Sequence, residues 1–411
     1  MSTLAHAFKL QAQAQPDKLA LICEDTRLSY AELAAGAQAW ANGLRAHGVC
    51  RGDHLALLLP NCVAFVQLML AAAELGLVLV PLNQTLPAKA IKKAIDVCAV
   101  RHVVASGWVL DALLLDGEQD LFNLPGMWIA IGDTQATVAH TEAKILGAAT
   151  TGMPGVDVVQ ADDRYILTMT SGSTGDPKPI VLTQQTKLLR AMAAAHMYGV
   201  SAADVTLAAT PLYHSLAERL VLLPLLTGGT CVLMARFSPR LWLQQVAEHG
   251  VTFSIAVSSQ LNQLLCQVEV DGSWDVSSLR CLVSSSALLE PAVKERLLVY
   301  FPCEFHECYG ASEIAVATSL HAGFARDKLG SVGHAPPGVE VRIADESGQT
   351  LAIGQPGEIV CKTPLLFSGY YGQTEATCAA MWGEYFRAGD IGRMDDQGYL
   401  YFLGRKKEII I

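Results

Sequence analysis

Several features that mark particular protein classes are absent from this sequence. The chain has a formal net charge of −10, and its basic residues form only short groups such as Lys92-Lys93 and Arg405-Lys406-Lys407. Because a nucleic-acid groove needs a continuous basic surface, nucleic acid is disfavoured as a partner. The sequence opens without a basic segment followed by an apolar stretch, so no signal peptide is expected and we predict a cytoplasmic location.

The sequence also lacks a disulfide or zinc framework. It has 11 cysteines but no Cys-x-x-Cys pair, which is typical of reduced thiols in the cytoplasm. The densest group, Cys303, His306 and Cys308, fits no zinc spacing well, and we interpret it as an ordinary strand and turn. The most apolar window, from Leu55 to Leu82, is interrupted by prolines and polar residues, so a buried helix between two strands is favoured over a membrane span.

The distribution of apolar residues predicts an α/β fold. The chain has 411 residues, of which 51% are hydrophobic and 17% charged, so we expect several packed subdomains. Apolar strands alternate with helices, as in a strand over 54–59, a helix over 63–75 and a strand over 77–81. This alternation favours parallel sheets covered on both faces.

The pattern divides the chain into four parts. We predict two doubly wound αβ subdomains at 1–165 and 166–330, and a small β-rich subdomain, a distorted barrel, at 331–403. Residues 404–411, which read as an apolar strand, are expected to form a hinge and the start of a further domain that the chain does not include.

The first motif with chemical content is Thr170-Ser-Gly-Ser-Thr-Gly-Asp-Pro-Lys-Pro179. It follows an apolar strand, Tyr165–Met169, and supplies hydroxyls, glycines and one lysine. Glycine allows close approach of backbone N–H groups to an anion, and lysine adds a positive charge. We therefore predict that it binds phosphate, and we disfavour the alternative of a polar linker. Its order differs from that of the common phosphate-binding loop, G-x-x-x-x-G-K-[ST].

Two later segments are weak signals when taken alone. In Cys308-Tyr-Gly-Ala-Ser-Glu313 the tyrosine suits stacking on a flat base, and the serine and glutamate suit a phosphate and Mg²⁺. In Tyr385-Phe-Arg-Ala-Gly-Asp390 an aspartate at the predicted end of a strand suits the two hydroxyls of a ribose.

The combination is far more specific than its parts. The loop at 170–179, Pro211-Leu-Tyr-His214, Tyr309–Glu313, Tyr385–Asp390 and Gly404–Lys407 occur in the order of the adenylate-forming superfamily, which the chain resembles over nearly its whole length. The resemblance implies an acid–thiol ligase that forms an acyl-adenylate from ATP and a carboxylic acid with Mg²⁺. The acyl group then passes to coenzyme A or, alternatively, to the phosphopantetheine arm of an acyl carrier protein.

The same resemblance assigns the site residues. It implies that Lys178, His214 and Glu313 are catalytic, with Glu313 the metal ligand, and that Lys407 is the hinge. It implies that ATP is bound by Thr170, Ser171, Gly172, Ser173, Thr174, Gly175, Lys178, Glu307 and Tyr309 (adenine), Ser312, and Asp390 with Arg405 (ribose). It implies that the acid pocket is lined by Tyr213, His214, Ser215, Ser285, Ser286, His306, Gly310 and Ile314.

Some positions depart from the family pattern. Pro179 replaces a usual glycine, which predicts a stiffer exit from the loop. Ser285-Ser286 stands where glycines are common, which predicts a narrower or more polar pocket. Ser215 stands where amino-acid-activating members carry an aspartate, which disfavours an α-amino acid and leaves a medium acyl chain or an aryl acid open. No residue matches the lysine of the family's C-terminal domain, which predicts slow turnover. A non-catalytic binding protein is the remaining alternative, disfavoured by Lys178, Glu313 and Asp390.

Overall fold

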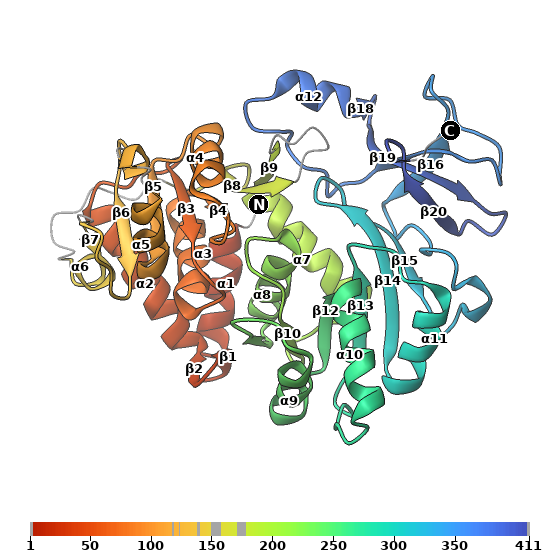
Figure 1. The fold of residues 1–411 in the computed structure, drawn as a ribbon, viewed down its shortest axis with the longest axis horizontal. Helices are drawn as coiled ribbons and strands as arrows, with labels where there is room; N and C mark the ends of the chain where they lie inside the picture. Colours follow the sequence, from red (N-terminus) through yellow and green to blue (C-terminus); the bar gives the residue numbers. More distant parts are fainter. Residues whose placement is uncertain are drawn as a thin grey trace.

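The computed structural model describes residues 3–116, 119–122, 124–137, 140–148, 158–170 and 178–408. Within these residues the strands form three sheets (Figure 1). The α/β fold class expected from the sequence is confirmed by this arrangement.

The first sheet has seven strands in the order β7-β6-β5-β3-β4-β8-β9. All neighbours are parallel except the antiparallel pair β8 and β9. The strands are β3 (His54–Leu58), β4 (Val78–Pro81), β5 (His102–Ser106), β6 (Trp128–Ile131), β7 (His140–Thr141), β8 (Arg164–Thr170) and β9 (Lys178–Thr183).

The second sheet has eight strands in the order β15-β14-β13-β12-β10-β11-β1-β2. Its interior pairs are parallel and its two edge pairs, β1 with β2 and β14 with β15, are antiparallel. The strands are β1 (Leu19–Cys23), β2 (Thr26–Ser29), β10 (Val205–Ala208), β11 (Thr230–Leu233), β12 (Phe253–Val257), β13 (Cys281–Ser285), β14 (Glu304–Ala311) and β15 (Ala315–His321).

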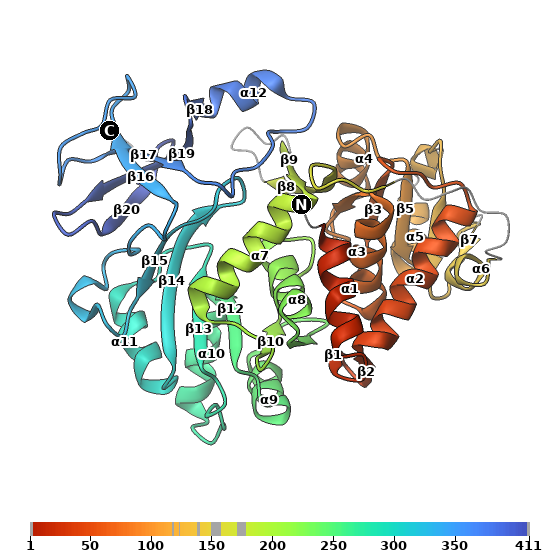
Figure 2. The same ribbon diagram turned by 180° about the vertical axis from the view of Figure 1, so that it is seen from behind.

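Helices cover both faces of the two large sheets, as Figures 1 and 2 show from opposite sides. A central layer lies between the sheets and contains α1 (Leu4–Ala14), α2 (Tyr30–Ala46), α3 (Val63–Leu75), α7 (Gln184–Tyr198) and α8 (Ser215–Thr227). The outer face of the first sheet packs on α4 (Ala88–Val97) and α5 (Gly107–Leu115). The outer face of the second packs on α9 (Pro239–His249), α10 (Ser258–Val270) and α11 (Pro291–Tyr300).

The strands of these sheets are apolar because both of their faces are covered. All five residues of β3 and all four of β4 are buried, and α3 between them buries Phe65, Leu68 and Met69. The buried helix between two strands that the sequence predicts over 55–82 is therefore confirmed. In the described part of the chain, none of the helices combines the length and the apolar character that crossing a bilayer would require.

The β-rich part is an open sheet rather than the expected barrel. Antiparallel strands lie in the order β16-β17-β19-β18, with β20 paired to β19. Within the described residues no pairing joins its outer strands, so the sheet does not close. The strands are β16 (Glu340–Ala344), β17 (Gly357–Lys362), β18 (Met381–Trp382), β19 (Tyr385–Met394) and β20 (Leu400–Arg405), and α12 (Thr374–Ala379) precedes β18.

Sheet membership does not follow the ranges expected from the sequence at two places. β1 and β2, near the start of the chain, pair with β11 of the second sheet. β8 crosses the expected boundary at 165/166, and both β8 and β9 belong to the first sheet. Parallel pairing joins strands far apart in the chain, so local patterns do not reveal it.

The start of α2 and the end of β20 depend on local residues. Ser29 caps α2: its hydroxyl accepts from Glu32 N, and Glu32 accepts in return from Ser29 N, a capping box. The strand expected over 404–411 is wrong for its middle part, because β20 ends at Arg405 and residues 406–408 form a turn. Residues 409–411 lie outside the described residues.

The remaining short elements connect these layers. They are α6 (Glu142–Leu146) and the single-turn helices η1 (Gln119–Phe122) and η2 (Arg326–Lys328).

Candidate functional site

The end of β14 lies where the second and third sheets meet (Figure 1). Tyr309 and Gly310 are in its last residues, and Ser312 and Glu313 follow in the turn to β15. A Cβ atom on Gly310 would lie 1.9 Å from the carbonyl oxygen of Ala315. Only glycine therefore fits the tight connection that carries Ser312 and Glu313.

Asp390 of the third sheet meets this strand end. The Tyr309 hydroxyl donates to Asp390 Oδ2 at 2.7 Å, and Arg405 Nη1 lies 3.1 Å from Asp390 Oδ1. Burial raises the pKa of Asp390 and, together with the Asp390 charge, raises the pKa of Tyr309 well above its usual range. The expectation that Asp390 ends a strand is wrong, because β19 continues to Met394. The three residues nevertheless form one group.

Glu313 and Lys178 are brought together by a residue that the sequence did not single out, Tyr370. The Tyr370 hydroxyl donates to Glu313 Oε1 at 2.8 Å, and Lys178 Nζ lies 5.3 Å from the centroid of the Tyr370 ring. The available signal was a pair of tyrosines directly after Gly369, whose φ of +102° favours glycine. Tyr370 thus holds a carboxylate and an ammonium at one place.

The segment around Tyr370 is attached to β9. Tyr371 N donates to the carbonyl oxygen of Pro179 at 2.8 Å, and Val181 N donates to that of Gly369 at 3.0 Å. Pro179 lies within β9 opposite Met169. The first sheet is therefore linked by backbone hydrogen bonds to the segment that connects β17 and β18 of the third sheet.

The structure describes only the two ends of the predicted phosphate loop. Ser171, Gly172, Ser173, Thr174 and Gly175 lie outside the described residues. Thr170 ends β8 and pairs in register with Lys178 at the start of β9. The flanking strands thus bring the two ends of the loop together.

Arg190 of α7 holds the turn after β14 through hydrogen bonds, and the sequence did not predict this role. Its Nη1 donates to the Ser312 carbonyl oxygen at 2.7 Å, and its Nη2 donates to that of Glu313 at 2.8 Å. The same guanidinium donates to the Leu365 carbonyl oxygen at 2.7 and 3.0 Å. Arg190 is only 5% exposed. A buried arginine within a helix carries no motif, so only the tertiary structure identifies it.

His214 lies at the start of α8, with its ring against that of Tyr213 at a centroid distance of 4.4 Å. It is solvent-exposed, yet the surrounding protein lowers its pKa, which favours the neutral imidazole. The neighbouring Ser215 lines a small cavity between α7 and α8 with Lys187, Arg190 and Arg219. Lys187 forms a buried ion pair with Glu218 there.

The other predicted pocket residues lie along β13, β14 and the turn that follows. Ser285 ends β13, Ile314 is buried, and His306 contacts the ring of Tyr198 at the end of α7. Burial and the neighbouring His321 lower the pKa of His306 to about 4. His306 therefore has a different set of neighbours from the pair Tyr213 and His214.

Ser286 has a backbone conformation that suits glycine better than serine. Its φ is +81°, which places a serine in the left-handed region. We expect Ser286→Gly to raise the free energy of unfolding by about 0.5–1 kcal/mol, because relief of strain exceeds the entropy gained by the unfolded chain. Chemical denaturation measures this. Ser285→Gly at the end of β13 is the matched control and should lower stability; a loss of stability in both variants would contradict the explanation.

Glu307, predicted to contact adenine, is engaged inside the protein. It is 2% exposed, forms an ion pair with the fully buried Lys294 and accepts a hydrogen bond from Leu289 N at 2.8 Å. Burial raises its pKa, and Lys294 opposes that rise. Its contacts are those of a structural residue, so its role toward adenine stays a prediction.

Lys407, the predicted hinge, lies exposed in the turn after β20, two residues beyond Arg405. Its hinge role stays a prediction.

Comparisons with known proteins relate the chain to one family. Residues 8–371 match the AMP-binding enzyme family. The chain is 31% identical over 404 residues to feruloyl-CoA synthase of Amycolatopsis sp., covering 98% of this chain and 78% of that protein. It is 30% identical over 410 residues to the long-chain-fatty-acid–CoA ligase FadD13 of Mycobacterium tuberculosis, covering 98% and 77%.

Solved structures give the same result. The N-terminal domain of FACL13 from Mycobacterium tuberculosis superposes with a TM-score of 0.86 at 28% identity, covering 98% of this chain and 100% of that one. O-succinylbenzoate coenzyme A synthetase from Bacillus subtilis, in complex with AMP, superposes with a TM-score of 0.85 at 26% identity, covering 98% and 79%.

Proposed function

The chain belongs to the AMP-binding enzyme family, and from this premise we propose that it is an AMP-forming acid–thiol ligase. It activates a carboxylic acid with ATP as an acyl-adenylate, releases pyrophosphate and transfers the acyl group to coenzyme A. The observation that carries the proposal is the convergence of two groups on the end of β14. Tyr309 with Asp390 forms one, and Glu313 with Tyr370 and Lys178 forms the other.

The first group suits the nucleoside of ATP. A carboxylate can accept hydrogen bonds from both hydroxyls of a ribose, and charge-assisted bonds of this kind are strong. Asp390 Oδ2 is held by Tyr309, while Oδ1 accepts no hydrogen bond from the described residues. The Tyr309 ring, at the same strand end, offers a face for the adenine. The Arg405 charge opposes the rise that burial causes in the pKa of Asp390 and so favours its ionised form.

The second group suits the phosphates and a metal ion. Glu313 Oε1 is oriented by Tyr370, and its other oxygen makes no hydrogen bond to the described residues, so Glu313 fits a Mg²⁺ that is bound by one carboxylate and substrate phosphates. When bound, Mg²⁺ would neutralise charge on the phosphates. Lys178 adds positive charge where pyrophosphate forms. Arg190 fixes the backbone that carries Ser312 and Glu313.

The start of α8 suits the acid. As a neutral imidazole, His214 can donate a hydrogen bond to the substrate carboxylate without forming an ion pair with it. An ion pair would make the carboxylate a weaker nucleophile. The carboxylate oxygen then attacks the α-phosphorus, and pyrophosphate leaves. In the second step the thiol attacks the acyl carbon, and AMP leaves.

The proposal also covers the class of carboxylic acid and the thiol that accepts the acyl group. The relatives' names include feruloyl-CoA synthase and indoleacetate–CoA ligase as well as long-chain fatty-acid–CoA ligases. We propose an acyl or aryl acid rather than an α-amino acid, since Ser215 offers no counter-charge to an ammonium. Coenzyme A is the proposed acceptor, and a phosphopantetheine-bearing carrier protein is the alternative.

Acid-dependent pyrophosphate release tests the function. We expect release from ATP with at least one member of a panel containing a hydroxycinnamic acid, an indole acetic acid and a long-chain fatty acid. Asp390→Asn should raise the KM for ATP roughly tenfold or more, because a hydrogen bond to a charged group contributes about 1.5–3 kcal/mol. Supplying coenzyme A or the carrier protein to the preformed adenylate identifies the acceptor.

The exposed Asp396→Asn is the matched control for charge and should leave the KM unchanged. ATP binding without pyrophosphate release for every acid would contradict the proposal and favour a non-catalytic binding protein.

A further inference from the structure

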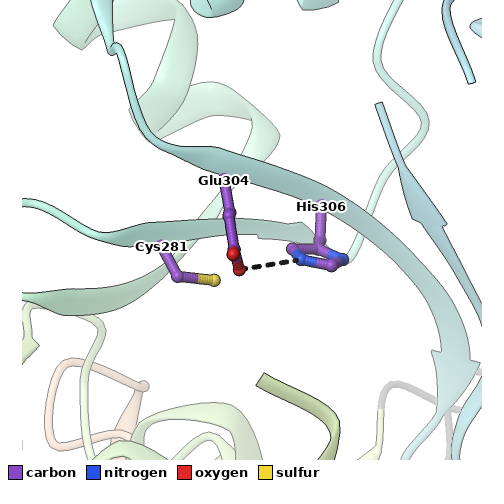
Figure 3. A group of neighbouring side chains, drawn as sticks. All are labelled: Cys281, Glu304 and His306. Carbon is purple, nitrogen blue, oxygen red and sulfur yellow. Dashed lines mark ion pairs between the residues drawn. The ribbon is translucent and has the colours of Figure 1, made fainter. Parts of the chain in front are cut away.

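Three metal-ligating side chains lie together on β13 and β14 (Figure 3). Cys281 and Glu304 are opposite each other in the parallel register, and His306 follows Glu304 by two residues, so all three project from one face of the sheet. Their sulfur, carboxylate oxygen and ring nitrogen atoms all lie within 4.8 Å of one another. His306 Nε2 is 3.9 Å from Glu304 Oε2.

His321 provides a second, independent observation. It lies opposite His306 in the antiparallel pair of β14 and β15, with ring centroids 4.4 Å apart. Both of its ring nitrogens are buried, and neither has a hydrogen-bond partner among the described residues. A buried polar group without a partner costs about 1–3 kcal/mol, so such a group in a native structure points to a water molecule or an ion.

We propose that Cys281, Glu304 and His306 bind a divalent transition-metal ion, with Zn²⁺ as the best match. A thiolate, an imidazole and a carboxylate are all ligands that zinc accepts, and the sulfur disfavours Mg²⁺ and Ca²⁺. Metal–ligand bonds of about 2.0–2.3 Å require the three atoms to approach by about 1 Å. The half-exposed Glu304 side chain can rotate to allow this. A ring nitrogen of His321 or a water molecule takes the fourth position.

The nearby thiols explain why sequence spacing did not reveal this site. Cys303, which is adjacent in sequence to Glu304, packs with the core on the outer face of the second sheet. Cys308 is buried farther along β14 and is not part of the group of three. The sulfur that completes the group comes instead from Cys281 on the neighbouring strand, and only strand pairing places it there.

The site differs from the Mg²⁺ position proposed at Glu313, which offers oxygen only. Formation of the sulfur–metal bond releases the thiol proton of Cys281 to solvent. The bound ion would join β13 to β14 three residues before Tyr309, and so would stabilise the strand that carries the nucleotide motif. The inference does not depend on the proposed reaction.

Cobalt is a spectroscopic probe for this site. The chelator-treated full chain, titrated with Co²⁺, should develop a thiolate-to-cobalt charge-transfer absorption at one equivalent, and Zn²⁺ should displace it. Cys281→Ser should abolish the band. His306→Gln and Glu304→Gln should weaken binding by at least tenfold. Zn²⁺ should raise the Tm of the wild type because it binds the folded state.

Two variants keep the test independent of folding. Glu304 is half-exposed, so Glu304→Gln should fold normally, and its metal-free Tm should match that of the wild type. Cys303→Ser should leave the cobalt band unchanged, since its thiol lies on the other face. The proposal is wrong if the wild type gives no charge-transfer band, or if the band survives in Cys281→Ser and is lost in Cys303→Ser.

Discussion

Replacing Arg190 with methionine is expected to reduce both stability and turnover strongly. The guanidinium donates to the backbone carbonyls of Ser312, Glu313 and Leu365 in a buried setting. Methionine leaves these acceptors without partners at about 1–3 kcal/mol each, so the free energy of unfolding should fall by about 3 kcal/mol or more. A shift of about 1 Å in Glu313 can lower kcat roughly 100-fold.

Three measurements separate positioning from simple structural support. Denaturant unfolding gives the stability loss, and steady-state kinetics at a temperature where the variant stays folded give kcat and KM. Because Arg190 holds the backbone of Glu313, the proposed Mg²⁺ ligand, the variant should also need more Mg²⁺ for half-maximal rate. Arg190→Lys should recover part of the stability, and the exposed Arg240→Met is the matched control. A stable, fully active Arg190→Met protein would exclude this role.

Replacing Lys294 with methionine is expected to destabilise the protein strongly. Lys294 is fully buried, and besides its ion pair with Glu307 it donates to the carbonyl oxygens of Leu329 and Ser331 at 2.5 and 3.1 Å. Methionine keeps the volume but leaves Glu307 as an unpaired buried carboxylate, which costs about 3–5 kcal/mol. Denaturant unfolding at pH 7.5 measures the loss.

The pH dependence of that loss has a defined sign. Burial already raises the pKa of Glu307, and removal of Lys294 raises it further. When the pKa of a carboxyl group is higher in the folded state than in the unfolded state, its protonated form stabilises the folded protein at low pH. That contribution to the free energy of unfolding is lost as the pH rises through the folded-state pKa. The variant should therefore be closer to wild type at pH 5 than at pH 7.5.

A double variant separates the structural role of Glu307 from a role in binding adenine. Lys294→Met with Glu307→Gln removes both charges, so it should be more stable than Lys294→Met alone. If Glu307 also contacts adenine, Glu307→Gln should raise the KM for ATP in either background. An unchanged KM would show that the family assignment of Glu307 does not apply here. Equal stability of the single and double variants would contradict the ion-pair argument.

The residues proposed to act on the substrate could be predicted from the sequence because their chemistry appears as short motifs. Tyr309, Glu313, Asp390 and Lys178 were predicted from local segments and their order, and the structure places Asp390 beside Tyr309 and Lys178 near Glu313. The residues that hold them were not predictable. Tyr370 and Arg190 act through hydrogen bonds between segments that are distant in the chain, and such contacts leave no periodic or spacing signal in the sequence.

The fold shows the same division. Apolar strands that alternate with helices determined the α/β class and most element positions, since burial on both faces requires that pattern. The pattern did not determine which sheet a strand joins. β1 and β2 belong to the second sheet, and β8 spans the boundary expected at 165/166. Nor did the pattern determine closure of the third sheet, which depends on pairing between its outer strands.

The sequence by itself determined the class of fold, the family and the chemical groups offered to ATP, because these depend on residue type and order. Only the tertiary structure decided that Glu307 is paired with Lys294, that Arg190 supports Glu313, and that Cys281 lies beside His306. These contacts join residues that are 13, 123 and 25 positions apart. Pairing of strands and packing of helices bring together residues that are far apart in the chain. These three contacts could therefore be found only in the folded structure.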